Sequence, residues 1–159
     1  TISLPSEDKA YLSRRELEER IAVCLGGRVA EELVLQDVST GASSDIQKAS
    51  EIARAMVTKY GMSEKLGAIA YGSESDEIFL GRSMAQARTY SEEVAAQIDQ
   101  EVKDIVDRAH ARCRDILTQH RHQLDITARY LLDHETMDAQ TFDHVFTQPD
   151  DPDLAGYQE

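Results

Sequence analysis

Residues 13–33 read SRRELEERIAVCLGGRVAEEL and carry the clearest periodicity of this sequence. Ser13 and Glu16 have the spacing of a capping box, in which the serine and glutamate side chains each satisfy a free backbone N–H at the start of a helix. Apolar residues then recur at every fourth position, on one side of a helix: Leu17, Ile21, Leu25, Val29 and Leu33. This pattern predicts an amphipathic helix over residues 13–35 with one buried face.

Two adjacent glycines, Gly26 and Gly27, lie in the middle of this predicted helix. Each glycine costs about 1 kcal/mol relative to alanine inside a helix. A close approach of a second helix would explain the pair, and a break in the helix is the alternative.

Helical periodicity continues through most of the remaining sequence. Gly61 stands where a left-handed C-cap would end the second helix. The apolar spacing predicts four further helices, over residues 44–60, 91–120, 122–133 and 138–146. The fold class expected from this sequence is therefore mainly α.

Any β structure is expected to be small. Thr1–Leu4 alternates and is stopped by Pro5, which is typical of the end of a strand. Residues 68–71 and 78–80 could pair as a hairpin or form a loop. Residues 147–159 open with the polar sequence Thr-Gln-Pro-Asp-Asp-Pro-Asp and are expected to form an acidic, disordered tail.

Composition excludes several classes of function. The 159 residues include 17 Lys and Arg against 30 Asp and Glu, a formal charge of −13. Such an acidic chain gains nothing from releasing counterions from phosphate backbones or from an anionic membrane, so neither nucleic acid nor direct membrane contact is expected. No apolar run reaches the roughly 18–20 residues of a membrane span. Cys24 and Cys113 are far apart and are expected to be reduced core thiols of a cytosolic protein.

Few residues are candidates for chemistry. No two of the five histidines have the i, i+4 spacing of a zinc-binding helix, and the sequence His134-Glu135 is followed by Asp138 where a second histidine would stand. No glycine-rich phosphate loop is present. The acidic pairs, such as Glu31-Glu32, are usual for solvated helix faces.

Asp45 is the one acid of its predicted helix that breaks the amphipathic sorting. It projects toward the apolar side, one turn before Ala49 and two before Ile52. An aspartate in the first turn is more often a cap or a partner of the helix dipole than a metal ligand. The residues alone leave both roles open.

Several short motifs in a fixed order resemble the peptidase domain of FtsH-type ATP-dependent zinc metalloproteases. They are GGRVAEE at 26–32, VSTGASSD at 38–45, GMSEKLG at 61–67, FLGRS at 79–83 and IDQEV at 98–102. The resemblance covers residues 1–146, which would make them part of such a peptidase domain.

The resemblance implies that Asp45 is the third zinc ligand. In the family, the other two ligands are histidines of an HExxH helix whose glutamate is the general base, and these lie upstream of the motifs found here. No catalytic residue is therefore expected in this chain, which is predicted to bind no zinc and to be inactive alone. ATP and Mg would belong to the family's AAA+ ATPase domain, which this sequence also lacks.

The resemblance further implies a homo-hexamer that degrades unfolded or tagged proteins. The parent protein would be anchored in the bacterial inner membrane with its protease domain facing the cytoplasm, while this piece is itself soluble. In that protein, this chain would supply the third zinc ligand, Asp45, and a helical scaffold. The alternative is a non-catalytic helical interaction module that has lost the metal-binding helix.

Overall fold

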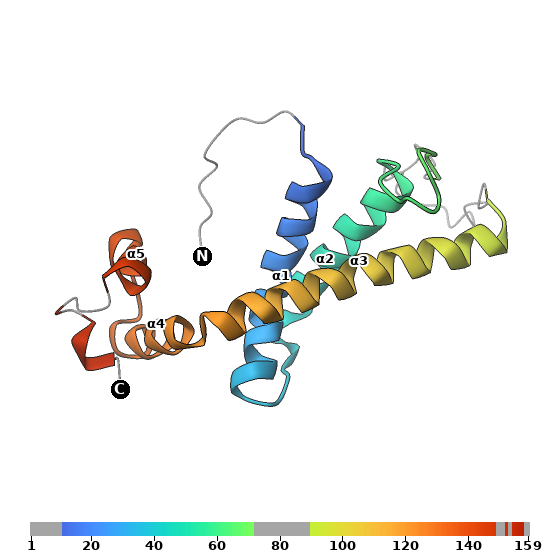
Figure 1. Ribbon diagram of the computed structural model, residues 1–159. Helices are drawn as coiled ribbons and strands as arrows, with labels where there is room; N and C mark the ends of the chain where they lie inside the picture. Colours follow the sequence, from blue (N-terminus) through green and yellow to red (C-terminus); the bar gives the residue numbers. More distant parts are fainter. Residues whose placement is uncertain (1–10, 72–89, 149–151, 153, 158–159) are drawn as a thin grey trace, which may run out of the picture. The chain divides into compact units, whose positions relative to one another are not determined.

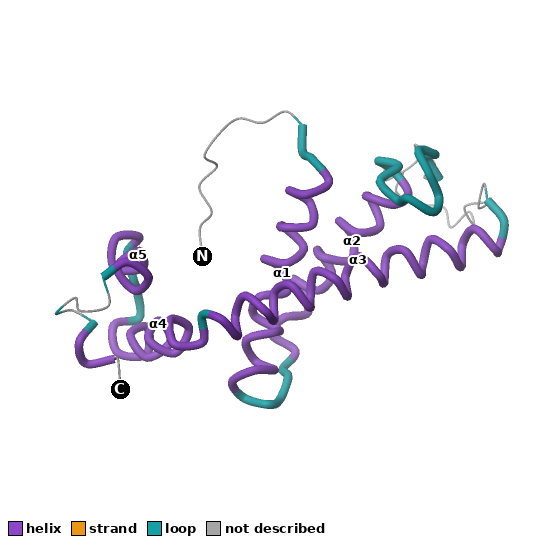
Figure 2. Tube along the Cα trace, in the orientation of Figure 1, coloured by secondary structure: helices purple, strands orange, loops and turns teal. Residues whose placement is uncertain are grey.

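A computed structural model describes residues 11–71, 90–148, 152 and 154–157 (Figures 1 and 2). The described part contains α-helices and short 3₁₀ turns but no strand, and its isolated β-bridge joins Ser63 to Gly67. The expected mainly α fold is confirmed. Residues 68–71 form no strand, while Thr1–Leu4 and residues 78–80 lie outside the described residues.

The chain divides into two compact units, Thr1–Cys113 and Arg114–Glu159. The first contains α1 (Arg14–Val34), the 3₁₀ turn η1 (Thr40–Ala42) and α2 (Ser43–Thr58). It also contains most of α3 (Glu92–Gln119). The second contains the end of α3, α4 (Arg121–His134), α5 (Ala139–Thr147) and the 3₁₀ turn η2 (Ala155–Tyr157). All five helix predictions agree with these bounds to within two residues.

Helix α1 begins as the sequence predicts. The hydroxyl of Ser13 accepts a hydrogen bond from the backbone N–H of Glu16, and the Glu16 carboxylate accepts one from the backbone N–H of Ser13. The predicted apolar stripe is buried at Leu17, Ile21, Leu25 and Val29. Helix α1 packs against α2, which runs beside it (Figure 1).

The glycine pair does not interrupt α1, which is continuous through Gly26 and Gly27. A Cβ built on either glycine would meet no atom within 4 Å. The helix break is therefore wrong as an explanation, and the close helix approach is not found in the described part of the chain. Both positions face open space here.

Helix α2 buries small and apolar side chains, namely Ala49, Ala53, Met56 and Val57. After its last turn the chain reverses at Gly61, whose φ is +60°. A Cβ at this position would lie 2.9 Å from the Cα of Ala68, so both the backbone angle and the space require glycine. The predicted left-handed position at Gly61 is thus confirmed.

Helix α3 has 28 residues and buries Ile98, Ile105, Ala109 and Cys113 within its length. Polar contacts join it to the other helices of its unit. The Arg54 guanidinium of α2 lies 3.2 Å from Asp99, and His110 lies 3.0 Å from the Glu32 carboxylate of α1. Within the described residues, no helix combines the length and the apolar character that crossing a bilayer requires.

The second unit has a small apolar core made by α4, α5 and the residues beyond them. Ile126, Val145 and Leu154 are buried together, and Tyr130, Met137 and Tyr157 pack around them. Asp138 caps α5 by accepting a hydrogen bond from the backbone N–H of Thr141 at 2.7 Å.

The end of the sequence differs from the expected disordered tail. Leu154 is 1% exposed and packs against Ile126 and Val145, and residues 155–157 form η2. The ring of Tyr157 lies edge-to-face with that of Tyr130, with centroids 5.5 Å apart. The expectation of disorder is wrong for these residues, because one leucine and one tyrosine among polar residues give no periodic signal yet suffice to dock a short segment.

Candidate functional site

Asp45 lies in the first turn of α2, directly after η1. The N-cap position of α2 is held by Ala42, whose side chain makes no capping hydrogen bond. Asp45 is therefore not the N-cap residue, although its carboxylate lies at the helix end where the dipole favours negative charge. The capping interpretation is removed, and the dipole and ligand interpretations remain.

The Asp45 side chain is not buried in this chain. It is 52% exposed, although Ala49 one turn later is fully buried. Its Oδ1 atom lies 3.6 Å from the Lys48 Nζ atom, which is itself on an exposed side chain. Asp45 is thus accessible in this chain, and it forms a loose surface ion pair with Lys48.

The loop before Asp45 is held to α1 by Glu31. The two carboxylate oxygens of Glu31 accept hydrogen bonds from the Ser39 backbone N–H at 3.0 Å and from the Ser39 hydroxyl at 2.8 Å. The backbone hydrogen bond first, and then the hydroxyl, keep the pKa of Glu31 below its usual value. The sequence analysis placed Glu31 on a solvated helix face and missed this contact, because pairs of adjacent glutamates are common on such faces.

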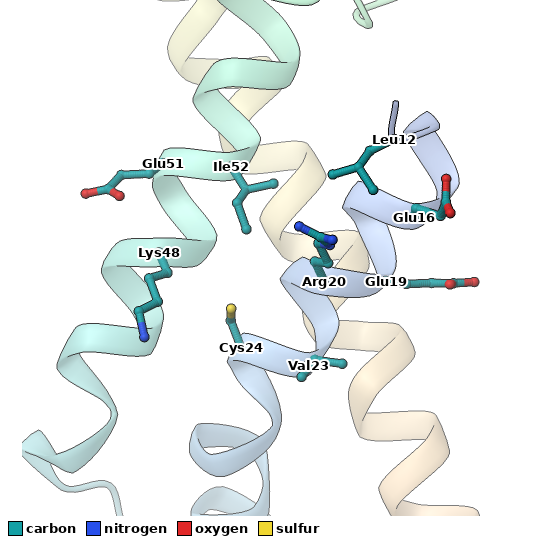
Figure 3. Close-up of a pocket in the computed structure, with 9 residues that line it drawn as sticks. All are labelled: Leu12, Glu16, Glu19, Arg20, Val23, Cys24, Lys48, Glu51 and Ile52. Atoms are coloured by element: carbon teal, nitrogen blue, oxygen red, sulfur yellow. The ribbon is translucent and has the colours of Figure 1, made fainter. Parts of the chain in front are cut away.

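A shallow hollow of about 520 Å³ lies between α1 and α2 (Figure 3). Leu12, Cys24 and Ile52 extend toward the space between the two helices, whereas Glu16, Glu19 and Glu51 extend away from it. Val23, which also lines the hollow, is 80% exposed. The full lining is Leu12, Glu16, Glu19, Arg20, Val23, Cys24, Lys48, Glu51 and Ile52.

Both cysteines are free thiols, as expected. Cys113 is buried, and burial raises the pKa of its thiol. Cys24 is half-buried and lines the hollow. Its pKa is also raised, mainly by burial and secondly by the negative charge of Asp45. A thiol with a raised pKa is a poor nucleophile at neutral pH, so the hollow contains no activated cysteine.

Asp45 is a single potential metal donor in this arrangement. Among the residues that the structure describes, no three or more His, Cys, Asp or Glu side chains are grouped so that they could hold a metal ion. His110 contacts Glu32, and His134 lies at the end of α4 with its Nδ1 atom 3.1 Å from the Tyr130 carbonyl oxygen. A zinc site needs three or four protein ligands, so the described residues do not make one by themselves.

The described residues form a mainly helical domain that presents one accessible carboxylate, Asp45, at a helix start. Residues 1–145 match the sequence profile of Peptidase family M41. The chain belongs to this family.

Curated relatives carry the name ATP-dependent zinc metalloprotease FtsH. The chain is 51% identical to FtsH 2 of Alkaliphilus metalliredigens over 92% of its own length and 21% of the relative. It is 50% identical to FtsH of Caldicellulosiruptor bescii, over 97% of the chain and 25% of the relative. It is 46% identical to FtsH of Thermotoga maritima, over 93% of the chain and 24% of the relative. The chain thus spans a fifth to a quarter of the length of these relatives.

Proposed function

We propose that this chain is part of an ATP-dependent zinc metalloendopeptidase in which Asp45 supplies one zinc ligand. The observation that carries the proposal is the family match over residues 1–145, which includes the loop VSTGASSD and the helix start that presents Asp45. The names of the relatives support the zinc-dependent and ATP-dependent parts.

The residues of this chain would contribute an accessible oxygen donor on a rigid element. The Asp45 carboxylate is half exposed and sits at a helix N-terminus, where the helix dipole favours negative charge. The remaining ligands and the general base would come from an HExxH helix outside this sequence. When bound, zinc lowers the pKa of a coordinated water to roughly 7 and polarises the scissile carbonyl.

The wider assembly belongs to the same proposal. A homo-hexamer, an AAA+ ATPase that uses ATP and Mg, and a membrane anchor in the bacterial inner membrane would deliver unfolded or tagged proteins to a peptidase site facing the cytoplasm. In this assembly the chain would supply Asp45 and a helical scaffold.

The isolated chain is expected to be inactive. Purified chain would be incubated with zinc and denatured casein, with and without a chelator, and bound zinc would be counted after dialysis. We expect no cleavage and no stoichiometric zinc, because a single carboxylate cannot hold the ion. Cleavage that a chelator abolishes would contradict this expectation.

The ligand role is tested in the intact protein. Asp45→Ala should lose both zinc and casein cleavage, whereas removing a mere helix-end interaction would cost about 0.5–2 kcal/mol of stability and leave the zinc content unchanged. Glu51→Gln provides a matched control, because it removes one exposed negative charge from the same helix. A fully zinc-loaded, active Asp45→Ala protein would reject the ligand role.

The competing hypothesis is a helical interaction module without chemistry. It predicts that the protein containing this chain has no HExxH helix upstream of residue 1, and that neither Asp45→Ala nor zinc removal changes its behaviour. Sequencing the gene upstream of this segment distinguishes the two.

A further inference from the structure

We propose that α4 and α5 form a docking surface for short peptide segments in which a tyrosine follows a leucine by three positions. The chain's own residues 154–157, Leu-Ala-Gly-Tyr, occupy this surface as a tethered ligand. The partner would be a segment of another protein that carries the same two side chains and displaces residues 154–157. The docking surface consists of the side chains on which this segment lies, namely Ile126, Tyr130, His134, Met137 and Val145.

Leu154 occupies the apolar part of the docking surface. It is buried together with Ile126 of α4 and Val145 of α5. The positions two residues to either side, Pro152 and Gly156, are exposed. The second unit therefore takes up one leucine side chain from this segment and leaves the backbone around it at the surface.

Tyr157 occupies the aromatic part of the docking surface. Its ring packs edge-on against the rings of Tyr130 and His134, with centroids 5.5 and 6.1 Å apart. Its hydroxyl lies 3.4 Å from His134 Nδ1 and also bonds to Asp133. Burial first, and then the bond to Asp133, raise the pKa of Tyr157, so the hydroxyl keeps its proton and can donate it to the carboxylate. Phenylalanine would keep the ring contacts and lose this hydrogen bond, so the surface favours tyrosine.

The spacing of the two anchors is set within the segment itself. The Tyr157 backbone N–H donates a hydrogen bond of 3.0 Å to the Leu154 carbonyl oxygen. In such a 3₁₀ turn, side chains three positions apart lie one above the other. The leucine and the tyrosine are thus presented together by a local turn, which a short free peptide can also form.

Side chains, and not backbone pairing, hold the segment in place. Within the described part of the chain, no backbone hydrogen bond joins residues 154–157 to α4 or α5. The contacts depend on the leucine and the tyrosine and not on the chain that supplies them. A second segment with the same pair would make the same contacts, and it would compete with residues 154–157 for the docking surface.

The tether sets the strength of this competition. A ligand on a short linker acts at an effective concentration of about 1 mM. A free peptide that binds the vacated surface at about 0.1 mM should therefore bind the wild-type chain about 10-fold more weakly. Removing the two anchors of the tethered segment should restore the full affinity.

The test uses the 159-residue chain and a fluorescent synthetic peptide, Pro-Asp-Leu-Ala-Gly-Tyr, with binding followed by anisotropy. The double variant Leu154→Ala/Tyr157→Ala should bind the peptide about 10-fold more tightly than the wild type. Peptides with alanine in place of the leucine or the tyrosine should not bind. A peptide with phenylalanine in place of the tyrosine should bind about 2- to 10-fold more weakly, because one hydrogen bond is lost.

A second measurement covers the loss of core packing in the double variant. Hydrogen exchange of the α4 and α5 amides should be faster in this variant and should slow again when the free peptide is added. Tyr157→Ala keeps Leu154 in the core and should bind the peptide with intermediate affinity. Leu132→Ala is the matched control, because this leucine is exposed on α4 outside the docking surface, and it should bind the peptide as weakly as the wild type.

Three results would overturn the proposal. The first is that neither the double variant nor Tyr157→Ala binds the peptide or gains protection from it. The second is that the alanine-substituted peptides bind equally well, which would show unspecific adhesion to an apolar surface. The third is a concentration-dependent dimer of the wild-type chain that the double variant does not form, because the occupant would then be a second copy of this chain.

Discussion

The hydroxyl of Ser63 donates a hydrogen bond of 2.7 Å to Glu101 Oε2, and this contact joins the loop after α2 to the middle of α3. Ser63 is only 5% exposed, and its oxygen also accepts a hydrogen bond from the Leu66 backbone N–H. Lys65 Nζ lies 3.0 Å from the other oxygen of Glu101. A largely buried carboxylate thus organises the turn that follows Gly61.

We expect Glu101→Ala to destabilise the first unit by about 1–3 kcal/mol, because the buried Ser63 hydroxyl loses its acceptor. Urea unfolding followed by circular dichroism measures this. Asp99→Ala on the same helix is the control, since its ion pair with Arg54 is exposed and should contribute about 1 kcal/mol or less. Equal losses for the two variants would show that the Ser63 contact adds nothing.

The same carboxylate predicts how stability depends on pH. Burial alone would raise the pKa of Glu101, but the hydrogen bonds from Ser63 and Lys65 outweigh burial and lower it from its ordinary value of 4.5. A lowered folded-state pKa stabilises the fold above the unfolded value, and this contribution disappears as the pH falls through the folded value. The stability difference between wild type and Glu101→Gln should therefore be largest near neutral pH and shrink below pH 4.5. A difference that stays constant from pH 7 to about pH 3 contradicts the prediction.

Replacing Gly61 or Gly26 by alanine should change the stability of the fold in opposite directions. Gly61→Ala places a Cβ in a left-handed backbone and 2.9 Å from Ala68, so a loss of at least about 1 kcal/mol is expected. Gly26→Ala fills open space in a continuous helix and should stabilise the chain by roughly 0.5–1 kcal/mol. Thermal unfolding of the two variants checks both. A destabilising Gly26→Ala would mean that the open space beside α1 is occupied in solution.

The two thiols should be labelled at different rates. Cys24 is half-buried beside the hollow, whereas Cys113 is buried in α3. An aromatic disulfide reagent should therefore modify Cys24 first, and slowly at neutral pH, because the pKa values of both thiols are raised. Cys24→Ser should remove the fast phase and Cys113→Ser should leave it. A fast phase that disappears in Cys113→Ser instead would contradict the burial of Cys113.

Regular periodicity explains why the helices could be predicted from the sequence. The structure contains the apolar stripe from Leu17 to Val29, with its spacing of four residues, and the capping box at Ser13, both as predicted. Each depends on residues only a few positions apart. The left-handed backbone at Gly61 follows from local sterics in the same way.

Contacts between separate segments could not be predicted in this way. Two hydrogen bonds, donated by Ser39 to Glu31 and by Ser63 to Glu101, join residues whose types are ordinary for solvated surfaces. The exposure of Asp45 also depends on tertiary packing, which helical angle alone does not show. The proposal that Asp45 is a ligand came from motifs that resemble a known family, because helical geometry alone also allowed a role at the helix end.

Leu154 provides the sharpest test of the second unit, because it lies in a polar segment and yet is 1% exposed against Ile126 and Val145. Leu154→Ala should destabilise this unit by about 2–5 kcal/mol, as expected for truncating a buried leucine. Hydrogen exchange of the α4 and α5 amides should accelerate accordingly, since one of the three central core side chains is lost. Leu132→Ala is the control: this leucine is 83% exposed on α4, and its truncation should change stability by no more than about 0.5 kcal/mol. Unchanged exchange in Leu154→Ala would mean that the segment does not dock, and that α4 and α5 are held together by Ile126 and Val145 alone.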